Sequence, residues 1–116
     1  MEKRTSDPNK AYEYWAGGPP DKNIKLTHGW YWQSAHWSRE YIMYLEINAP
    51  AEWRAAYIKQ NNLMETQTNP GFPQDAPAWF KPGKKFRTLV RAGSGGESVY
   101  YEDTLKGMML IYETQL

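Results

Sequence analysis

The fold of this chain is decided by residues 40–50, which read EYIMYLEINAP. Side chains of a strand alternate between its two faces, and here one face is uniformly apolar and should face a core. That face carries Tyr41, Met43, Leu45 and Ile47. The opposite face begins with Ile42 and Tyr44, so it too is apolar near its start. We therefore expect a central strand that is covered on both sides.

The main helix is expected directly after this strand. Pro50 suits the first helical position, and Glu52 lies in the first turn, where the helix dipole favours a negative charge. Asn61 and Asn62 suit a helix end, because Asn tolerates a left-handed backbone. One stripe with helical spacing should then lie on the sheet, and it comprises Trp53, Ala56, Tyr57 and Gln60.

The rest of the chain predicts four more strands and a short helix around this unit. Asp7-Pro8 starts a helix that ends at Ala16, and the strands are expected at 25–35, 86–92, 97–102 and 108–115. The predicted fold is therefore α+β, in the order helix-β-β-α-β-β-β. About five antiparallel strands form the sheet, and one main helix packs on it to give two layers. Residues 1–23 form an N-terminal tail with the short helix and a Pro/Gly linker, and residues 24–116 form a single domain.

Composition limits the functions that the chain can have. It has 116 residues and no Cys, which excludes disulfides, a thiolate metal site and a thiol nucleophile. Its 14 Lys and Arg against 13 Asp and Glu leave a net charge of +1. Nucleic-acid binders usually carry a clear basic excess, so nucleic acid is not the expected partner. Six Trp and nine Tyr are unusual, and they suit the boundary between a core and a binding face.

The N-terminus leaves the compartment open. Met1 is followed by charged residues, and no apolar run reaches the roughly 18 residues that a membrane helix needs. Met1 could be a native cytoplasmic start, or it could replace a removed leader of a periplasmic or exported protein. No transmembrane segment is expected, and the chain could be a monomer or a weak dimer.

Residues 64–83 show no periodicity and contain four prolines. A long irregular connection in a compact domain is usually functional or ordered by its own side chains. We expect Trp79 or Phe80 to pin it to the sheet. Gly93 to Gly96 joins two predicted strands, so a hairpin turn is favoured there over a phosphate-binding loop, which would lead into a helix.

The chain contains two histidines, His28 and His36. On one continuous strand His28 and His36 would stand roughly 26 Å apart, which excludes a shared metal site. His36, with Ser34 and Glu40 nearby, is the better candidate for chemistry. A Ser-His-Glu triad needs an exposed Ser on a strained elbow, and no such motif occurs, so a hydrogen-bonded structural His is favoured.

The charged residues near the C-terminal strands have competing interpretations. Basic residues interleaved with aromatic ones suit single-stranded nucleic acid, an acidic protein patch or a plain solvated face. Strand parity places Arg87 and Arg91 on one face, so a solvated outer face paired with acidic neighbours is the simplest account. The basic residues are Lys81, Lys84, Lys85, Arg87 and Arg91, and the acidic ones are Glu97, Glu102 and Asp103. The carboxylates are expected to be solvated at a turn edge.

The run Trp30-Tyr31-Trp32 is the most distinctive feature of the sequence. Alternation sends Trp30 and Trp32 to one face and Tyr31 to the other. Both faces could be core, or one could be an exposed aromatic platform for a protein or a sugar ring.

We therefore predict a small non-enzymatic binding module with no cofactor and no metal. Another protein is the expected partner, as for an inhibitor or immunity-type protein, and the expected contacts are Trp79, Phe80, Lys81, Trp37 and Arg39. The alternative is carbohydrate or small-ligand binding through an exposed Trp/Tyr face. A small hydrolase using His36 is the third hypothesis.

Overall fold

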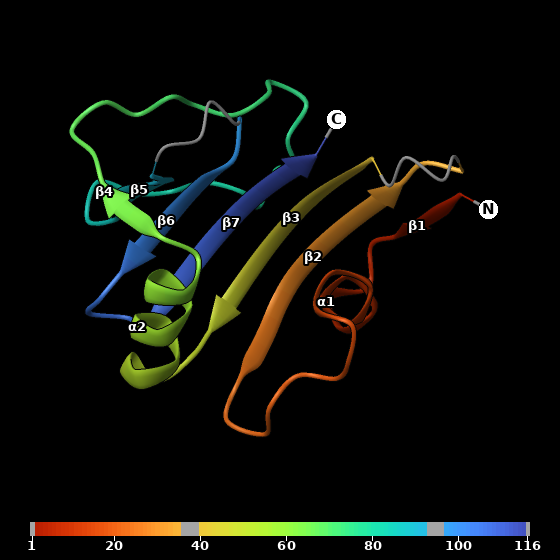
Figure 1. Ribbon diagram of the computed structural model, residues 1–116, viewed down its shortest axis with the longest axis horizontal. Helices are drawn as coiled ribbons and strands as arrows, with labels where there is room; N and C mark the ends of the chain where they lie inside the picture. Colours follow the sequence, from red (N-terminus) through yellow and green to blue (C-terminus); the bar gives the residue numbers. More distant parts are fainter. Residues whose placement is uncertain (1, 36–39, 93–96, 116) are drawn as a thin grey trace.

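The computed structural model describes residues 2–35, 40–92 and 97–115, and one antiparallel sheet of seven strands dominates it (Figure 1). The strands follow the spatial order β1-β2-β3-β7-β6-β5-β4. Their bounds are β1 Lys3–Thr5, β2 Lys25–Gln33, β3 Tyr41–Asn48, β4 Leu63–Glu65, β5 Arg87–Arg91, β6 Val99–Asp103 and β7 Met108–Gln115. The helices are α1, Pro8–Ala16, and α2, Ala51–Gln60.

The α+β class and the antiparallel sheet are confirmed, whereas the number and order of the strands were wrong. The chain runs β-α-β-β-α-β-β-β-β. The predicted order differs because it lacked β1 and β4. Both are three residues long and occupy the two edges of the sheet. A segment this short has no readable periodicity, so its pairing depends on a neighbouring strand that is already in place.

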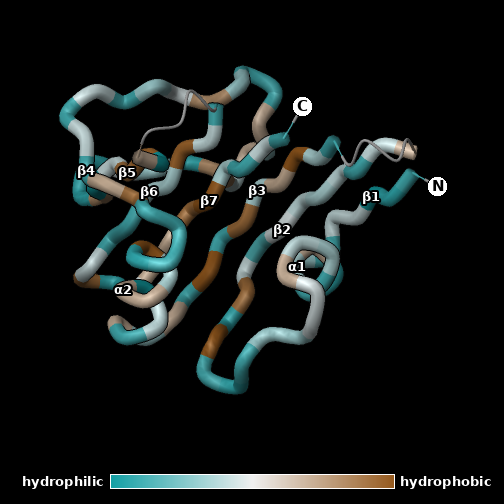
Figure 2. The backbone as a smooth tube through the Cα atoms, in the orientation of Figure 1, coloured by the Kyte–Doolittle hydropathy of each residue, from teal (hydrophilic) through white to brown (hydrophobic). Residues whose placement is uncertain are grey.

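The central strand is β3, as residues 40–48 predicted. It pairs with β2 on one side and β7 on the other, and its register matches Leu45 with Gly29 and with Ile111. Met43, Leu45 and Ile47 have no exposed surface. Figure 2 shows hydrophobic segments concentrated along the middle of β3 and β7, with hydrophilic ones at the periphery.

Both helices lie in front of the sheet as Figure 1 is drawn. The Asp7 side chain caps α1 by accepting from the backbone N–H groups of Asn9 and Lys10, and Gly17 ends it in a left-handed conformation. α1 packs against β2 and β3, and α2 lies farther along the same face. The front core therefore joins side chains of both helices to the strands, including Ala11, Tyr12, Tyr57, Leu45, Tyr100 and Ile111.

Close approach of α1 to the sheet depends on Gly29 in β2. A Cβ at that position would lie 2.8 Å from the Pro8 Cα and 3.1 Å from the Ala11 Cβ. Any side chain there would therefore displace the start of α1.

The back of the sheet is covered by the irregular segment between β4 and β5. Phe80 is 2% exposed and packs edge-on against Tyr44 and Phe72. The expectation that Trp79 or Phe80 pins this segment is confirmed. The back core contains Tyr44, Phe80, Val99, Tyr101, Leu110 and Tyr112. The molecule therefore has the two predicted layers, sheet and helices, and a loop that covers the other face of the sheet.

Candidate functional site

A buried carboxylate, Glu113 of β7, is the centre of the most elaborate polar arrangement in the described part of the chain. Oε1 accepts hydrogen bonds from Trp15 Nε1 at 2.8 Å and from the Tyr41 hydroxyl at 2.6 Å. Oε2 accepts from the Tyr100 hydroxyl at 2.7 Å and from Arg91 Nη2 at 3.3 Å. Glu113 is 5% exposed, so these donors replace the water that its charge would otherwise need.

Four different elements bring these partners together. Register places Glu113 opposite Met43, so its side chain lies on the front face of the sheet. The preceding residues of β7 on that face are apolar. Trp15 reaches Glu113 from the last turn of α1, Tyr41 from the start of β3, Tyr100 from β6 and Arg91 from β5. The network therefore fastens α1 to the sheet.

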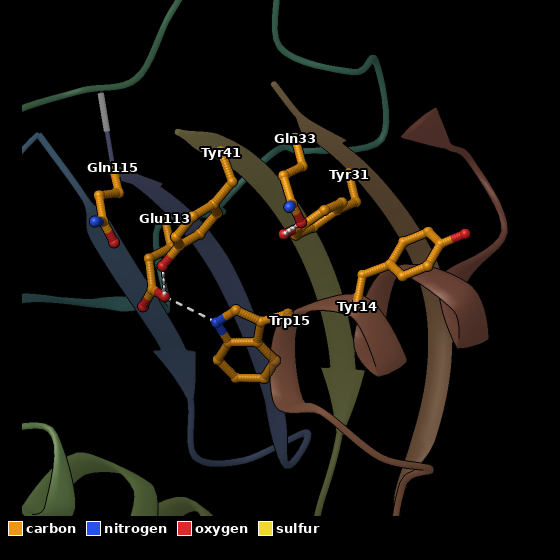
Figure 3. Close-up of a pocket in the computed structure, with 7 residues that line it drawn as sticks. All are labelled: Tyr14, Trp15, Tyr31, Gln33, Tyr41, Glu113 and Gln115. Carbon is orange, nitrogen blue, oxygen red and sulfur yellow. Dashed lines mark hydrogen bonds between the residues drawn. The ribbon is translucent and has the colours of Figure 1, made fainter. Parts of the chain in front are cut away.

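A hollow of about 480 Å³ opens beside this network. Figure 3 shows the side chains around it, with Glu113 and Trp15 joined on one side and Tyr31 and Gln33 on the other. Its lining is Tyr14, Trp15, Tyr31, Gln33, Tyr41, Glu113 and Gln115. Tyr31 stacks on Tyr41 with centroids 5.9 Å apart and meets Tyr14 at 5.5 Å. The hollow thus has aromatic walls with amides and a carboxylate between them.

Two of the three tyrosine hydroxyls that line this hollow, those of Tyr31 and Tyr41, already donate their protons to other side chains. Tyr41 donates to Glu113, and Tyr31 donates to Gln33 Oε1 at 2.9 Å. Burial and then the bonded Glu113 carboxylate raise the pKa of Tyr41 well above its ordinary value, and burial raises the pKa of Tyr31. These hydroxyls therefore stay protonated and present oxygen lone pairs to a ligand.

A second hollow of about 460 Å³ lies on the back of the sheet, under the loop between β4 and β5. Its lining is Trp30, Ile42, Tyr44, Pro73, Asp75, Pro77, Glu97 and Tyr112. Trp30 and Tyr44 lie 6.0 Å apart between ring centroids, and Tyr44 stacks on Tyr112 at 4.9 Å. The central strands thus separate two aromatic hollows on opposite faces.

The predicted contact residues do not form one surface in the described chain. Trp79 is half-buried and stacks on His28 with ring centroids 5.0 Å apart. Lys81 is exposed, whereas Phe80 is buried in the back core and can contribute to a surface only by holding its neighbours in place. Trp37 and Arg39 lie outside the described residues.

Of the two histidines, His28 lies among the described residues and His36 does not. His28 shares a 2.8 Å hydrogen bond with Glu46 on the neighbouring strand and is half-exposed. His36 lies outside the described residues, as do the turn at 38–39 and the one at 93–96. Ser34 and Glu40, named with His36, are joined through a 2.9 Å backbone hydrogen bond.

The charged residues of β5 and β6 were partly misread from the sequence. Arg87 and Arg91 do share a face, and Arg87 pairs with Glu102 at 2.7 Å as the cross-strand reading suggested. Glu102 is not solvated at a turn edge, however. It is 4% exposed and pairs with Arg54 of α2 at 2.8 Å, a contact that no sequence pattern had indicated. Asp103, which was expected to be solvated as well, is 3% exposed.

Sequence reasoning missed Glu113, although a signal for it exists. In MMLIYETQ, at 108–115, it has the same parity as Met109 and Ile111, which places a carboxylate on an otherwise buried face. Such a residue needs buried donors, which Trp and Tyr supply. The identity of those donors could not be read, because they come from elements far apart in the chain.

Comparison of the chain with protein-family models, with curated proteins and with solved structures finds no match. In the described ranges, no group of three or more His, Asp or Glu side chains is placed to hold a metal ion. Neither α1 nor α2 is long and apolar enough to cross a membrane.

Proposed function

We propose that this protein is a non-enzymatic binding module that takes a neutral polyhydroxyl ligand, of the carbohydrate class, in the hollow beside Glu113. One observation carries the proposal. The hollow combines aromatic walls with hydroxyl oxygens whose protons are already donated, so it offers acceptors to a ligand that is rich in hydroxyl donors.

The polar groups of the lining suit this ligand class. The Tyr41 oxygen accepts, while the amide groups of Gln33 and Gln115 can also donate. A sugar ring presents an apolar face and a rim of hydroxyls, and the aromatic walls can pack against the former. Arg91 already neutralises much of the Glu113 charge at 3.3 Å, so a neutral ligand fits better than a cation here.

A titration with neutral mono- and disaccharides, followed by the indole N–H resonance of Trp15, tests the proposal. We expect one or more saccharides to shift that resonance saturably. Tyr14→Ala removes one wall without touching the Glu113 network and should weaken binding about fivefold, the magnitude of one aromatic contact. Lys10→Ala, an exposed change on the same helix, should bind as the wild type does.

The proposal fails if no saccharide perturbs Trp15, or if Tyr14→Ala binds as tightly as Lys10→Ala. Folding of each variant is checked by far-ultraviolet circular dichroism, so that loss of structure is separated from loss of binding.

Binding of another protein through the loop between β4 and β5 is the second candidate. It is favoured by Trp79, which keeps part of its surface exposed beside Lys81 on a segment that Phe80 fixes in place. Preorganised aromatic and basic side chains are typical of interface hot spots. A partner captured by the wild type and by Lys59→Ala, but lost with Trp79→Ala, would support this role. Equal capture by all three would exclude it.

A further inference from the structure

The hollow on the back of the sheet differs from the one beside Glu113 in its electrostatics. Two carboxylates, Asp75 and Glu97, line it, and neither makes an ion pair with any described residue. The described residues of its lining include no Lys, Arg or His. Glu113, by contrast, has Arg91 as its counter-ion. Among the described residues, the two carboxylates of the back hollow therefore have no counter-ion.

The walls of this hollow are aromatic and apolar. Trp30, Tyr44 and Tyr112 form an aromatic corner, and Pro73 and Pro77 of the loop also line the hollow. An aromatic ring attracts a cation through its negative face, and Trp does so most strongly. A volume of about 460 Å³ lies within the range of small-ligand sites.

The side chain of Tyr44, which is largely buried, lines the same space. Tyr44 is 4% exposed, and its hydroxyl has no hydrogen-bond partner among the described residues. Burial, then the nearby Tyr112 and Asp75, raise the pKa of Tyr44, so its hydroxyl stays protonated. No described residue bonds this hydroxyl, so it can form a hydrogen bond with a ligand in the hollow.

We propose that the back hollow binds a small organic cation, an alkylammonium group, between Trp30 and the carboxylates of Asp75 and Glu97. The aromatic corner packs against the carbon substituents of the nitrogen, and the two carboxylates balance its charge. The site is independent of the saccharide site proposed above, because the sheet separates the two.

Binding of choline and propylammonium, measured by calorimetry and by the indole N–H resonance of Trp30, tests this inference. We expect at least one of them to bind, and 3,3-dimethyl-1-butanol, the uncharged carbon analogue of choline, to bind at least tenfold more weakly. Asp75→Asn and Glu97→Gln keep the shape and remove the charge, and each should weaken binding about fivefold, the upper range for an exposed charge pair.

Matched variants separate this site from the other hollow. Tyr44→Phe should weaken binding of the cation, whereas Tyr14→Ala should leave it unchanged because Tyr14 lies on the front face. The inference is overturned if neither cation binds, if the uncharged analogue binds equally well, or if Asp75→Asn and Glu97→Gln bind as the wild type does. A failed saccharide titration with intact cation binding would reject only the function proposed above.

Discussion

Single charged side chains, buried at defined places, connect the helices to the sheet. Arg54 of α2 lies beside Glu102 of β6, and their side chains are 7% and 4% exposed. The Arg54 guanidinium also donates to the Ala49 carbonyl, so the start of α2 is bonded to the same group. Glu113 plays the corresponding part for α1 through Trp15. Each helix is therefore fixed by one ionised group as well as by apolar contact.

The Arg54→Met variant tests the importance of the first of these contacts. Methionine keeps much of the side-chain volume but leaves Glu102 with Arg87 as its remaining partner. Because Glu102 then loses the more deeply buried of its two counter-ions and keeps only the partly exposed Arg87, we expect the free energy of unfolding in urea to fall by about 2 kcal/mol. Lys59→Met, at an exposed position of the same helix, should change stability by less than about 0.5 kcal/mol. Equal stability of the two variants would contradict this account.

At the scale of the elements, the long segment between β4 and β5 acts as a cover for the back of the sheet. Phe80 contacts Tyr44, Phe72 and Tyr101 at centroid distances of 5.2, 4.9 and 6.2 Å. The Tyr101 hydroxyl donates to Asn69 at 2.8 Å and ties down the beginning of the same segment. Irregular backbone is therefore held by side chains at both of its ends.

Phe80→Ala should release this cover. Truncation of a buried phenylalanine costs about 3–5 kcal/mol, and here it should also expose residues 66–86 to proteases before the rest of the chain. Limited proteolysis with mass spectrometry, together with urea denaturation, measures both effects. Lys85→Ala in the same segment serves as the control. Cleavage first in α2 or β7 would show that the segment is not held through Phe80.

The same elements show how far sequence alone could reach. Tyr41 to Asn48 and Met108 to Gln115 were readable because alternation over eight residues leaves one continuous apolar face. β1 and β4 were not readable, since three residues of mixed polarity acquire strand geometry only from a paired neighbour. The aromatic content indicated aromatic-rich clusters, which the structure contains. Which aromatics line a common hollow depends on register and on helix placement, and neither is encoded locally.

At the scale of the whole molecule, buried tyrosines make the stability of the fold depend on pH. Burial, followed by the nearby Glu113 charge, raises the pKa of Tyr57 well above its ordinary 10.0 and raises that of Tyr100 as well. The Tyr57 hydroxyl is buried with no hydrogen-bond partner in the described chain, so no hydrogen bond stabilises its ionised form. The folded protein therefore holds protons that the unfolded chain releases.

This difference predicts loss of stability in alkali. In the unfolded chain tyrosines ionise near pH 10, whereas in the folded protein they stay protonated to higher pH. The stabilisation is thus fully present below about pH 10 and declines as the pH rises above it. Urea midpoints should be level between about pH 7 and 9 and should fall by about pH 11. The decline should be shallower in Tyr100→Phe, and a midpoint that stayed level to about pH 11 would contradict the assignment.

The contact between Gly29 and the start of α1 has a consequence for recognising distant homologues of this protein. Because a Cβ at Gly29 would meet Pro8 and Ala11, the strand position and the helix position constrain each other across the intervening chain. A distant descendant of the same ancestor could replace most of the surface and still need a glycine opposite a small residue at this crossing. Searching for that coupled pair, ahead of a strand patterned like β3, offers a way to find such descendants when overall resemblance has faded.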